Sequence, residues 1–295
     1  MSNPRIGVIG IPNAWSTETL ADRVEQATGF RLVVDMAEVE LDLAQMTLRY
    51  DGWDLCQLDA LLIKKISKSY APDTLDRLEL LRVAEQSGLR IFSPPINTLR
   101  LIDRLSCTIT LRQHDIPMPE SVITADYSCA LQAVERFGDT ILKPLYSTKA
   151  RGMLLINSSD SHATKRAKLH SFHSNNPMLY IQRKLNLPGH DLGMVFLGGD
   201  YLGCYSRVKQ GSSWNTTIHS GGRYQPYQPS TELIDLAYRA QKPFALDFTT
   251  VDVAETDQGA VVFEVSAFGG FRGAQEGIGI DAAALYVEYA LAQLS

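Results

Sequence analysis

The sequence lacks the features that mark several common classes of protein. Only four cysteines occur among 295 residues, and none forms a CxxC pair. Neither a zinc site nor a disulfide framework is therefore indicated, and a reducing compartment is expected. No segment approaches the roughly 18 continuous apolar residues of a membrane span. The N-terminus shows no basic region, long apolar stretch or cleavage site of a signal peptide. We therefore expect a cytoplasmic protein.

An excess of basic charge is also absent. The formal net charge is -5, and the lysines and arginines are dispersed along the chain. An unselective binder of nucleic acid or of an anionic membrane would need a basic surface, so neither partner is expected. No GxGxxG motif is present, which argues against a dinucleotide-binding domain. With 45% hydrophobic and 21% charged residues, the chain has the composition of a globular protein long enough for two or three α/β subdomains.

The first 95 residues alternate between apolar strand patterns and amphipathic helix patterns, which predicts a small parallel-sheet domain. Lys64 and Lys65 come at the carboxyl end of one predicted strand, where open α/β sheets carry their sites. Pro94 and Pro95 mark the first boundary. The predicted elements are strands at 6–11, 31–36, 58–66 and 90–93, a hairpin within 39–52, and helices at 16–28 and 72–86.

The remaining two thirds of the chain mixes helices with strand pairs. A helix near 159–172 carries His170 and His173 beside basic residues, and a solvated face is favoured there over a metal site. The segment 209–224 is polar and rich in glycine. The other predicted elements are helices at 97–114, 127–137, 231–241 and 281–294, strands flanking a polar loop within 140–156, a strand at 179–185, and hairpins within 191–208 and 251–266.

The last hairpin is the most informative segment, because it places two carboxylates opposite each other. Asp252 and Glu264 lie equally far from Gln258, so a three-residue loop at 257–259 pairs them directly. The period of two predicts one polar face and one apolar face. The polar face would hold Asp252, Glu264 and Ser266, and the apolar face Val251, Val253, Val261, Phe263 and Val265.

Two acidic groups across a strand pair repel each other unless a cation or a shared proton offsets them. The ligands on this face are oxygens, which favours Mg²⁺ or Mn²⁺, and Mg²⁺ commonly completes its shell with water and nucleotide phosphates. The alternative is an exposed hairpin whose acidic residues are solvated.

A second candidate site follows the strand that ends at Lys143. A flexible loop rich in serine, threonine and glycine comes after this lysine. Such a loop can cover a triphosphate, with the lysine as a point charge and backbone N–H groups as donors. The alternative is a β-hairpin in which the lysine extends along apolar surface to reach water.

The order of these motifs resembles the RimK-like ligases of the ATP-grasp superfamily, from about residue 90 to the C-terminus. The segments LKPLYSTKARGM and EVSAFGGFRG further resemble the GAK-system ATP-grasp group. The resemblance implies an ATP-grasp fold of α+β lobes behind an N-terminal parallel-sheet domain. The implied parts are an N-terminal α/β domain at 1–96, a small lobe with the phosphate-covering loop at 97–180, and a large lobe with the metal site at 181–295.

The resemblance also implies roles for individual residues, with ATP and Mg²⁺ (or Mn²⁺) as cofactors. Asp252, Glu264 and Ser266 would hold metal, and Arg207 would stabilise the transferred phosphoryl group. Nucleotide contacts would come from Arg104, Lys143, the loop with Ser147, Thr148 and Gly152, the segment Gln182, Arg183, Lys184 and Leu185, and Asp191 and Asn215.

The chain departs from the family pattern at several of these positions. Arg104 stands where lysine is usual, and only Gly152 remains of a closing loop that is usually richer in glycine. An Asp-x-Arg pattern becomes Asp191-Leu192-Gly193, which removes a charge from the substrate side. The usual EVN triplet is EVS, so a hydroxyl replaces a carboxamide, and Ser266 would ligate metal directly or through water.

The resemblance implies a carboxylate–amine ligase that forms an amide bond through an acyl phosphate. Two alternatives stay open, a kinase or phosphotransferase on the same fold and a non-catalytic nucleotide-binding scaffold. The substrate would lie near Gly221 and Gly222, with Arg272 either a carboxylate anchor or a surface residue. Expected partners are a small-molecule or peptide carboxylate and an amine, with a protein acceptor and a homodimer as further options.

Overall fold

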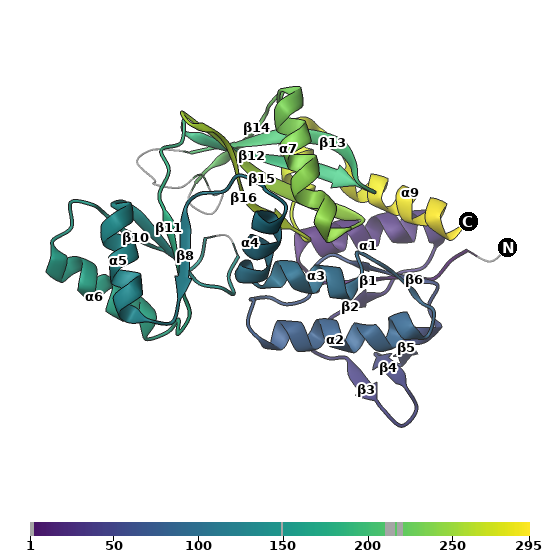
Figure 1. The fold of residues 1–295 in the computed structure, drawn as a ribbon. Coiled ribbons are helices and arrows are strands. Elements are labelled where there is room, and N and C mark those ends of the chain that lie inside the picture. Colours follow the sequence, from purple (N-terminus) through teal and green to yellow (C-terminus); the bar gives the residue numbers. More distant parts are fainter. Residues whose placement is uncertain (1–2, 149, 210–215, 217–220) are drawn as a thin grey trace.

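A four-stranded parallel sheet forms the N-terminal part of the chain (Figure 1). The computed structural model describes residues 3–148, 150–209, 216 and 221–295. The sheet has the order β2-β1-β6-β7, which confirms the predicted parallel arrangement. Its elements are β1 (Ile6–Ile9), α1 (Trp15–Thr28), β2 (Val33–Val34), β6 (Ala60–Ile63), α2 (Asp73–Gln86) and β7 (Arg90–Phe92).

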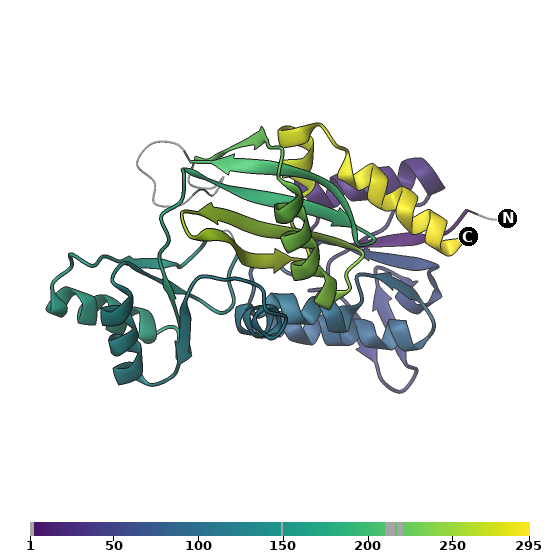
Figure 2. The same ribbon diagram turned by 45° about the horizontal axis from the view of Figure 1, so that its top comes forward.

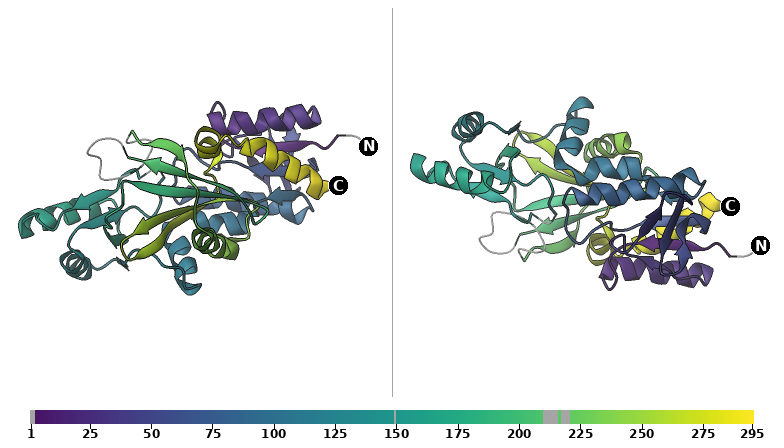
Figure 3. Two further views of the ribbon diagram at one scale, coloured as in Figure 1. Left: turned by 90° about the horizontal axis from the view of Figure 1, so that it is seen from above. Right: turned by 90° about the horizontal axis from the view of Figure 1, so that it is seen from below.

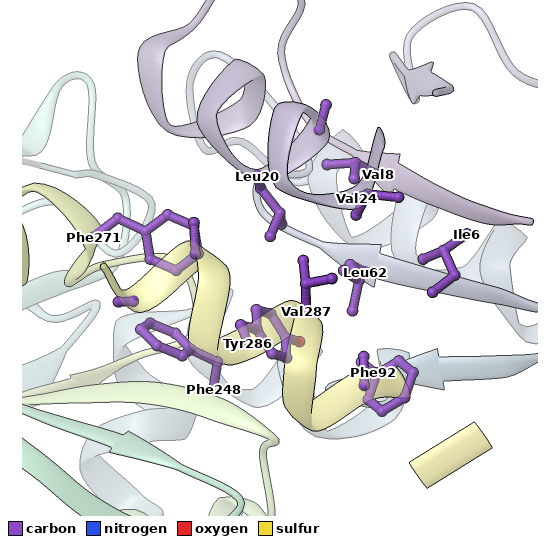
Figure 4. Packing of buried hydrophobic residues seen from close by; sticks show 14 of the residues in the cluster. Ile6, Val8, Leu20, Val24, Leu62, Phe92, Phe248, Phe271, Tyr286 and Val287 are labelled. Atoms are coloured by element: carbon purple, nitrogen blue, oxygen red, sulfur yellow. The ribbon is translucent and has the colours of Figure 1, made fainter. Parts of the chain in front are cut away.

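The two faces of this sheet enter different cores because consecutive strand residues point to opposite sides. Ile6 and Val8 pack with α1 and the C-terminal helix α9 (Ala282–Leu294), whereas Ile9 packs with α2. Figure 4 shows Tyr286 and Val287 of α9 lying between the sheet and the rest of the molecule. The C-terminal helix is therefore built into the N-terminal core, and both chain ends lie on the same side of the molecule (Figures 1 and 3).

The hairpin predicted within 39–52 is confirmed and carries one further short strand. Its strands pair in the order β3-β4-β5 beside the parallel sheet. The elements are β3 (Glu40–Asp42), β4 (Thr47–Tyr50), β5 (Trp53–Asp54) and the 3₁₀ turn η1 (Leu55–Gln57).

The single helix predicted at 97–114 is wrong, because the structure has two helices, α3 (Pro95–Ile102) and α4 (Arg104–Gln113). Asp103 between them is extended, and its carboxylate accepts a hydrogen bond from the backbone N–H of Leu105. An aspartate in this position satisfies one of the free N–H groups of a new helix. The break places Arg104 in the first turn of α4.

A four-stranded antiparallel sheet with two helices forms a smaller body that projects from the rest (Figure 2). Its strand order is β10-β9-β11-β8, and α5 and α6 pack on it around a separate apolar core. The predicted boundary at residue 180 falls within β11, and the three-part division stays a prediction. The elements are β8 (Ser121–Thr124), α5 (Tyr127–Phe137), β9 (Thr140–Lys143), β10 (Leu154–Ile156), α6 (His162–His173) and β11 (Leu179–Arg183).

The largest sheet has five antiparallel strands in the order β14-β13-β12-β15-β16. Helix α7 packs against one face, and α8 packs on the other beside β13 and β14. Strand β14 and helix α8 were not predicted. The elements are β12 (His190–Leu197), β13 (Asp200–Val208), β14 (Arg223–Pro226), α7 (Thr231–Gln241), η3 (Lys242–Phe244), β15 (Phe248–Thr256), β16 (Gly259–Ser266) and α8 (Phe271–Ile278).

These sheets confirm the predicted mixed α/β class with a parallel sheet at the N-terminus. None of the helices in the described part of the chain is both long and apolar enough to cross a bilayer.

Candidate functional site

The hairpin of β15 and β16 places Asp252 and Glu264 directly opposite each other, as predicted. The details that produce this pairing differ from the prediction. Thr256 pairs with Gly259, so the turn has two residues rather than three, and the register shifts between Asp252 and Val253. One residue of β16, Phe263, is the extra residue of a β-bulge. The shorter turn and the bulge each move the register by one residue, and the two shifts cancel at the carboxylates.

The bulge changes which side chains face the core. Val262 is fully buried in the core with Val251 and Val253, whereas Phe263 lines a cavity on the opposite side. The prediction that Val261 and Phe263 belong to the apolar face is wrong, because the extra residue reverses the alternation on the turn side of Glu264. Val265, on the other side of the bulge, lies in the core as predicted.

A cavity of about 450 Å³ lies where the three larger sheets meet. It receives side chains from the residues just after β6 in the parallel sheet, from α4, from β9 and the loop after it, and from β11. Further side chains come from the face of the five-stranded sheet that carries Asp252 and Glu264. The predicted residues that line it are Arg104, Lys143, Ser147, Thr148, Gln182, Arg183, Lys184, Leu185, Asp191, Arg207, Asp252, Glu264 and Ser266.

Four predicted residues are not in that lining, and one lies outside the described residues. Gly152 lies between Ala150 and Met153, which do line the cavity, and Gly221 and Gly222 lie just before β14. Arg272 is half-exposed on α8, where it pairs with Glu276 and stacks on the ring of Trp15. Asn215 falls outside the described residues.

Lys143 is the last residue of β9 and is buried, with 7% of its surface exposed. Its ammonium donates a hydrogen bond to Oε1 of Gln182 at 2.6 Å and lies 5.5 Å from the centre of the Phe263 ring. Burial, followed by the nearby charge of Arg104, lowers the pKa of Lys143 to about 7. Because Gln182 carries no charge, an anion that enters the cavity would stabilise the charged form of Lys143.

Arg104 joins three parts of the cavity wall. Its guanidinium donates to the carbonyl of Pro144 at 3.2 Å, to Oε2 of Glu264 at 3.0 Å and to Oγ of Ser147 at 3.3 Å. The same side chain therefore reaches the loop that is predicted to cover phosphates and one predicted metal ligand. Planar guanidinium groups suit this kind of shared contact with oxygen acceptors.

Arg207 on β13 pairs with two carboxylates, Asp191 on β12 and Asp252 on β15, the latter at 3.0 Å. Burial opposes its charge, but these two carboxylates outweigh that effect and raise the pKa of the guanidinium above its ordinary value. Each predicted metal carboxylate thus has an arginine partner, Asp252 with Arg207 and Glu264 with Arg104.

Asp252 shows the cost of placing acidic groups together. Burial raises the pKa of this carboxyl, Arg207 lowers it, and the charges of Glu264 and Asp191 raise it further. Ser266 pairs with Thr250 two residues along the hairpin from the carboxylates, and its Oγ accepts a long hydrogen bond, 3.4 Å, from the N–H of Phe268. The described residues contain no group of three or more His, Cys, Asp or Glu side chains that could hold a metal. Two carboxylates and a hydroxyl suit Mg²⁺, whose shell takes water and phosphate oxygens as well.

The end of β11 and the residues directly after it also line the cavity. Arg183 donates its backbone N–H to Glu120, and Lys184 donates its own to Asp139. Both side chains also pair with these acidic residues, at 3.0 and 3.6 Å. Gln182 is buried, and its amide bridges Lys143 and Ser121. The amide of Gln182 therefore orients the lysine that the strand pattern singled out.

Many lining residues were missed as site residues, and two of them, Phe263 and Lys64, show why. Phe263 was assigned to the core, and no sequence signal revealed the bulge. Lys64 also lines the cavity, and its place at a strand end was the signal that could have included it.

These features agree with a family match over most of the chain. A model described as the RimK-like ATP-grasp domain matches residues 102–290. The chain belongs to the RimK-like ATP-grasp family. As a member of it, the chain is an ATP-dependent ligase with an ATP-grasp fold. The finer resemblance to the GAK-system group stays a prediction.

Relatives with similar sequences extend over almost the whole chain. One is the tetrahydromethanopterin:alpha-L-glutamate ligase of Methanosarcina acetivorans, 22% identical over 97% of this chain and 98% of the relative. Another is a probable alpha-L-glutamate ligase of Rhodopirellula baltica, 24% identical over 96% of this chain and 69% of the relative.

Solved structures show the same fold in other ATP-grasp proteins. The ATP-grasp ligase PsnB, solved with a minimal precursor, Mg and ADP, aligns with a TM-score of 0.75 at 20% identity and covers 100% of this chain and 99% of its own. The D-alanyl-alanine synthetase A of Vibrio cholerae aligns with a TM-score of 0.72 at 14% identity and covers 100% of this chain and 99% of its own.

Proposed function

We propose that this RimK-like ATP-grasp protein is an ATP- and Mg²⁺-dependent carboxylate–amine ligase that works through an acyl phosphate. One observation carries the proposal. The cavity brings the cations Arg104, Lys143 and Arg207 together with the paired carboxylates Asp252 and Glu264. Such a set suits a reacting polyphosphate, since phosphoryl transfer depends on preorganised charge rather than on a covalent catalyst.

The chemistry has two balanced steps. An oxygen of the substrate carboxylate bonds to the γ-phosphorus of the substrate ATP while the bond from that phosphorus to the β–γ bridging oxygen breaks. ADP leaves, and an acyl phosphate remains. The amine nitrogen then attacks the acyl carbon, phosphate leaves, and the nitrogen loses a proton. The product is an amide.

The residues of the cavity suit separate parts of this task. Lys143 and Arg104 would bind phosphate oxygens, and Arg207 would offset the charge that develops on the transferred group. Asp252, Glu264 and Ser266 would hold Mg²⁺, which supplies positive charge against the phosphates when it is bound. Gln182, Arg183, Lys184 and Leu185 would form the nucleotide end of the cavity.

L-Glutamate is the first amine to test, because several relatives are named as glutamate ligases. Peptide acceptors belong in the same screen, since PsnB was also solved with a precursor peptide. Mn²⁺ can be compared with Mg²⁺ in the same assays. The proposed cytoplasmic location and dimeric state would be checked by fractionation and by sedimentation.

The proposal is tested by trapping the acyl phosphate. The protein is incubated with ATP, Mg²⁺ and a panel of small carboxylates and peptides in the presence of hydroxylamine, which converts an acyl phosphate to a hydroxamate. ADP release and a hydroxamate of one panel member are expected, followed by an amide when the hydroxylamine is replaced by L-glutamate or another amine. Mass spectrometry identifies both products.

The variant Asp252→Asn serves as the matched control, because it keeps the shape of the side chain and removes its charge. It should form neither product while its circular dichroism spectrum matches the parent protein. A stable phosphorylated product that hydroxylamine does not intercept would instead establish the kinase alternative. Nucleotide binding without product from any member of the panel would support the scaffold alternative.

A further inference from the structure

Lys64 is a buried cation of the cavity that the proposed chemistry does not use. It follows directly after β6, where its backbone N–H donates to the carbonyl of Ile9, so the parallel sheet fixes its position. Only 2% of its surface is exposed. The side chain lines the same cavity as Asp252 and Glu264 but comes from the N-terminal sheet.

The ammonium of Lys64 bonds to the turn after β16, the strand that carries Glu264 and Ser266. It donates to the carbonyl of Phe268 at 2.7 Å and to that of Gly269 at 3.3 Å. It also lies 3.8 Å from the centre of the Phe271 ring and 5.7 Å from that of Phe248. Figure 4 shows these two rings together between α9 and the five-stranded sheet. In the described part of the chain, these hydrogen-bond and ring partners of Lys64 are all uncharged.

The turn at Gly269 and Gly270 also lies close to Thr250 of β15. A Cβ atom at Gly269 would lie 2.5 Å from Oγ1 of Thr250, and one at Gly270 would lie 2.5 Å from its Cγ2. Gly270 also has a φ of 94°, a conformation that favours glycine. The backbone at Gly269 and Gly270 therefore passes too close to Thr250 for a side chain, and Lys64 bonds to the carbonyls of Phe268 and Gly269.

The turn connects directly to the predicted metal ligands. Ser266, two residues before Phe268, accepts the N–H of Phe268 on its hydroxyl. The direction of that hydroxyl consequently depends on the position of the turn. Glu264 lies two residues further back on the same strand.

An apolar side chain at position 64 would fill this space without an electrostatic cost. Burial, together with repulsion from Lys65, lowers the pKa of Lys64 to about 7, which means that its charge destabilises the folded chain. Methionine has no donor and could not bond to the carbonyls of Phe268 and Gly269 as Lys64 does.

We propose that Lys64 is a positioning residue, which fixes the 268–270 turn and thereby sets the geometry of Ser266 and Glu264 for a metal–nucleotide complex. The proposal rests on the proposed function for its second half only. Lys64 makes the metal site depend on the N-terminal sheet, although every predicted metal ligand belongs to the five-stranded sheet.

The test uses Lys64→Met in the full chain, which keeps the contact with the two rings and removes the donors. Hydrogen exchange of the protein without ligand is measured by mass spectrometry on peptides that cover 266–273. Exchange at 268–271 is expected to be about tenfold faster than in the parent protein. The thermal midpoint should change little, because removal of the buried charge offsets the loss of the two hydrogen bonds.

The second measurement uses ADP and Mg²⁺ as probes. The ratio of ADP affinity with Mg²⁺ to affinity without it should fall about tenfold in Lys64→Met, the size expected for lost charge-assisted hydrogen bonds. The affinity for ADP alone should stay within about twofold. A residue that acts only through overall stability would lower the thermal midpoint and both affinities together.

Lys165→Met is the matched control, since Lys165 is another buried lysine but pairs with Glu135 in the smaller body. It should change neither measurement. Should Lys64→Met fail to fold, Lys64→Gln is measured instead, because its shorter amide also cannot reach both carbonyls.

Unchanged exchange at 268–271 in the folded variant overturns the proposal. A different outcome is faster exchange in Lys64→Met when Mg²⁺ has no effect on the ADP affinity of the parent protein. This outcome would still show that Lys64 fixes the turn. In that case the proposed function fails and the positioning contact does not.

Discussion

Lys143 shows how the surroundings of one residue set its charge. The chain buries its ammonium against a neutral amide, and its pKa falls to about 7 from an ordinary 10.5. Between these two values the unfolded chain binds more protons at this position than the folded chain does. The free energy of unfolding therefore rises with pH across that window. Below about pH 7 the buried charge of Lys143 destabilises the folded chain by its full amount.

A polyphosphate should reverse this shift, which predicts that nucleotide binding takes up a proton. At about pH 8.5, where Lys143 is largely neutral in the free protein, ADP with Mg²⁺ is expected to bind with an uptake of about one proton. The measurement is calorimetry in buffers with different ionisation enthalpies. Lys143→Met should lose that uptake and weaken binding by about 1 to 3 kcal/mol.

Lys64→Met is the informative comparison for this experiment, because Lys64 also has a lowered pKa but already bonds to the 268–270 turn. It should retain the uptake that Lys143 provides. Equal proton uptake by the parent protein and Lys143→Met would contradict the assignment of Lys143 to the phosphates.

The sequence predicts residues whose role follows from charge and position along the chain. Lys143, Arg104 and the two carboxylates of the hairpin were found in this way, and the structure brings them into one cavity. Gln182 was also predicted, but its contact with Lys143 depends on the pairing of β9 with β11, which local sequence does not determine.

At the scale of the element, the β15–β16 hairpin shows how a correct pairing can come from an incorrect turn. Counting outward from Gln258 paired Asp252 with Glu264, although the turn is one residue shorter and Phe263 is bulged. Phe263 does not have a positive φ, so this bulge needs no glycine and leaves no such signal in the sequence. The hairpin and its polar face could therefore be predicted, whereas the orientation of Phe263 could not.

Two arginines from other elements pair with the carboxylates of this hairpin in the free protein. Arg104 pairs with Glu264, and Arg207 pairs with Asp252. Nucleotide phosphates and metal would exchange these partners, since phosphates suit the arginines and the metal suits the carboxylates. Metal alone should consequently bind weakly.

Arg104→Gln is predicted to have opposite effects on the two ligands. With its partner removed, Glu264 faces Asp252 without a balancing cation, so Mg²⁺ alone should bind severalfold more tightly. ADP should bind about tenfold more weakly, because one charge-assisted contact to phosphate is gone. Calorimetric titration of each ligand separately measures both changes.

Arg112→Gln provides the matched control, because Arg112 is an exposed arginine on the same helix as Arg104. It should leave both affinities unchanged. Weaker binding of Mg²⁺ alone by Arg104→Gln would show that the arginine does not act as a counter-ion to the metal carboxylates.

At the scale of the whole molecule, the cavity depends on contacts between segments far apart in the sequence. Lys64 bonds to the carbonyl of Phe268, and the N–H of Val262 donates to the carbonyl of Pro117 at 2.8 Å. Strand patterns predicted the individual sheets, since alternation and turn residues are local signals. Local patterns do not predict how the sheets pack against one another. A residue such as Lys64, whose contacts depend on that packing, was therefore not predicted as a site residue.

A ligand that binds across this junction should stabilise all of its walls together. We predict that ADP with Mg²⁺, at a hundredfold excess over its dissociation constant, stabilises the folded chain by about 2.7 kcal/mol. Hydrogen exchange should slow at once in 140–147, in 179–185 and in 264–270, because each segment contributes residues to the cavity. Differential scanning calorimetry and exchange mass spectrometry measure the two effects.

Asp252→Asn should bind ADP without the effect of Mg²⁺ and therefore lose most of the protection at 264–270, while part of the protection at 179–185 remains. This difference is expected because Asp252 is a proposed metal ligand, whereas Gln182 to Leu185 are proposed to contact the nucleotide. Protection confined to 179–185 in the parent protein would mean that the nucleotide does not reach the hairpin, and Asp252 and Glu264 would then have no part in binding it.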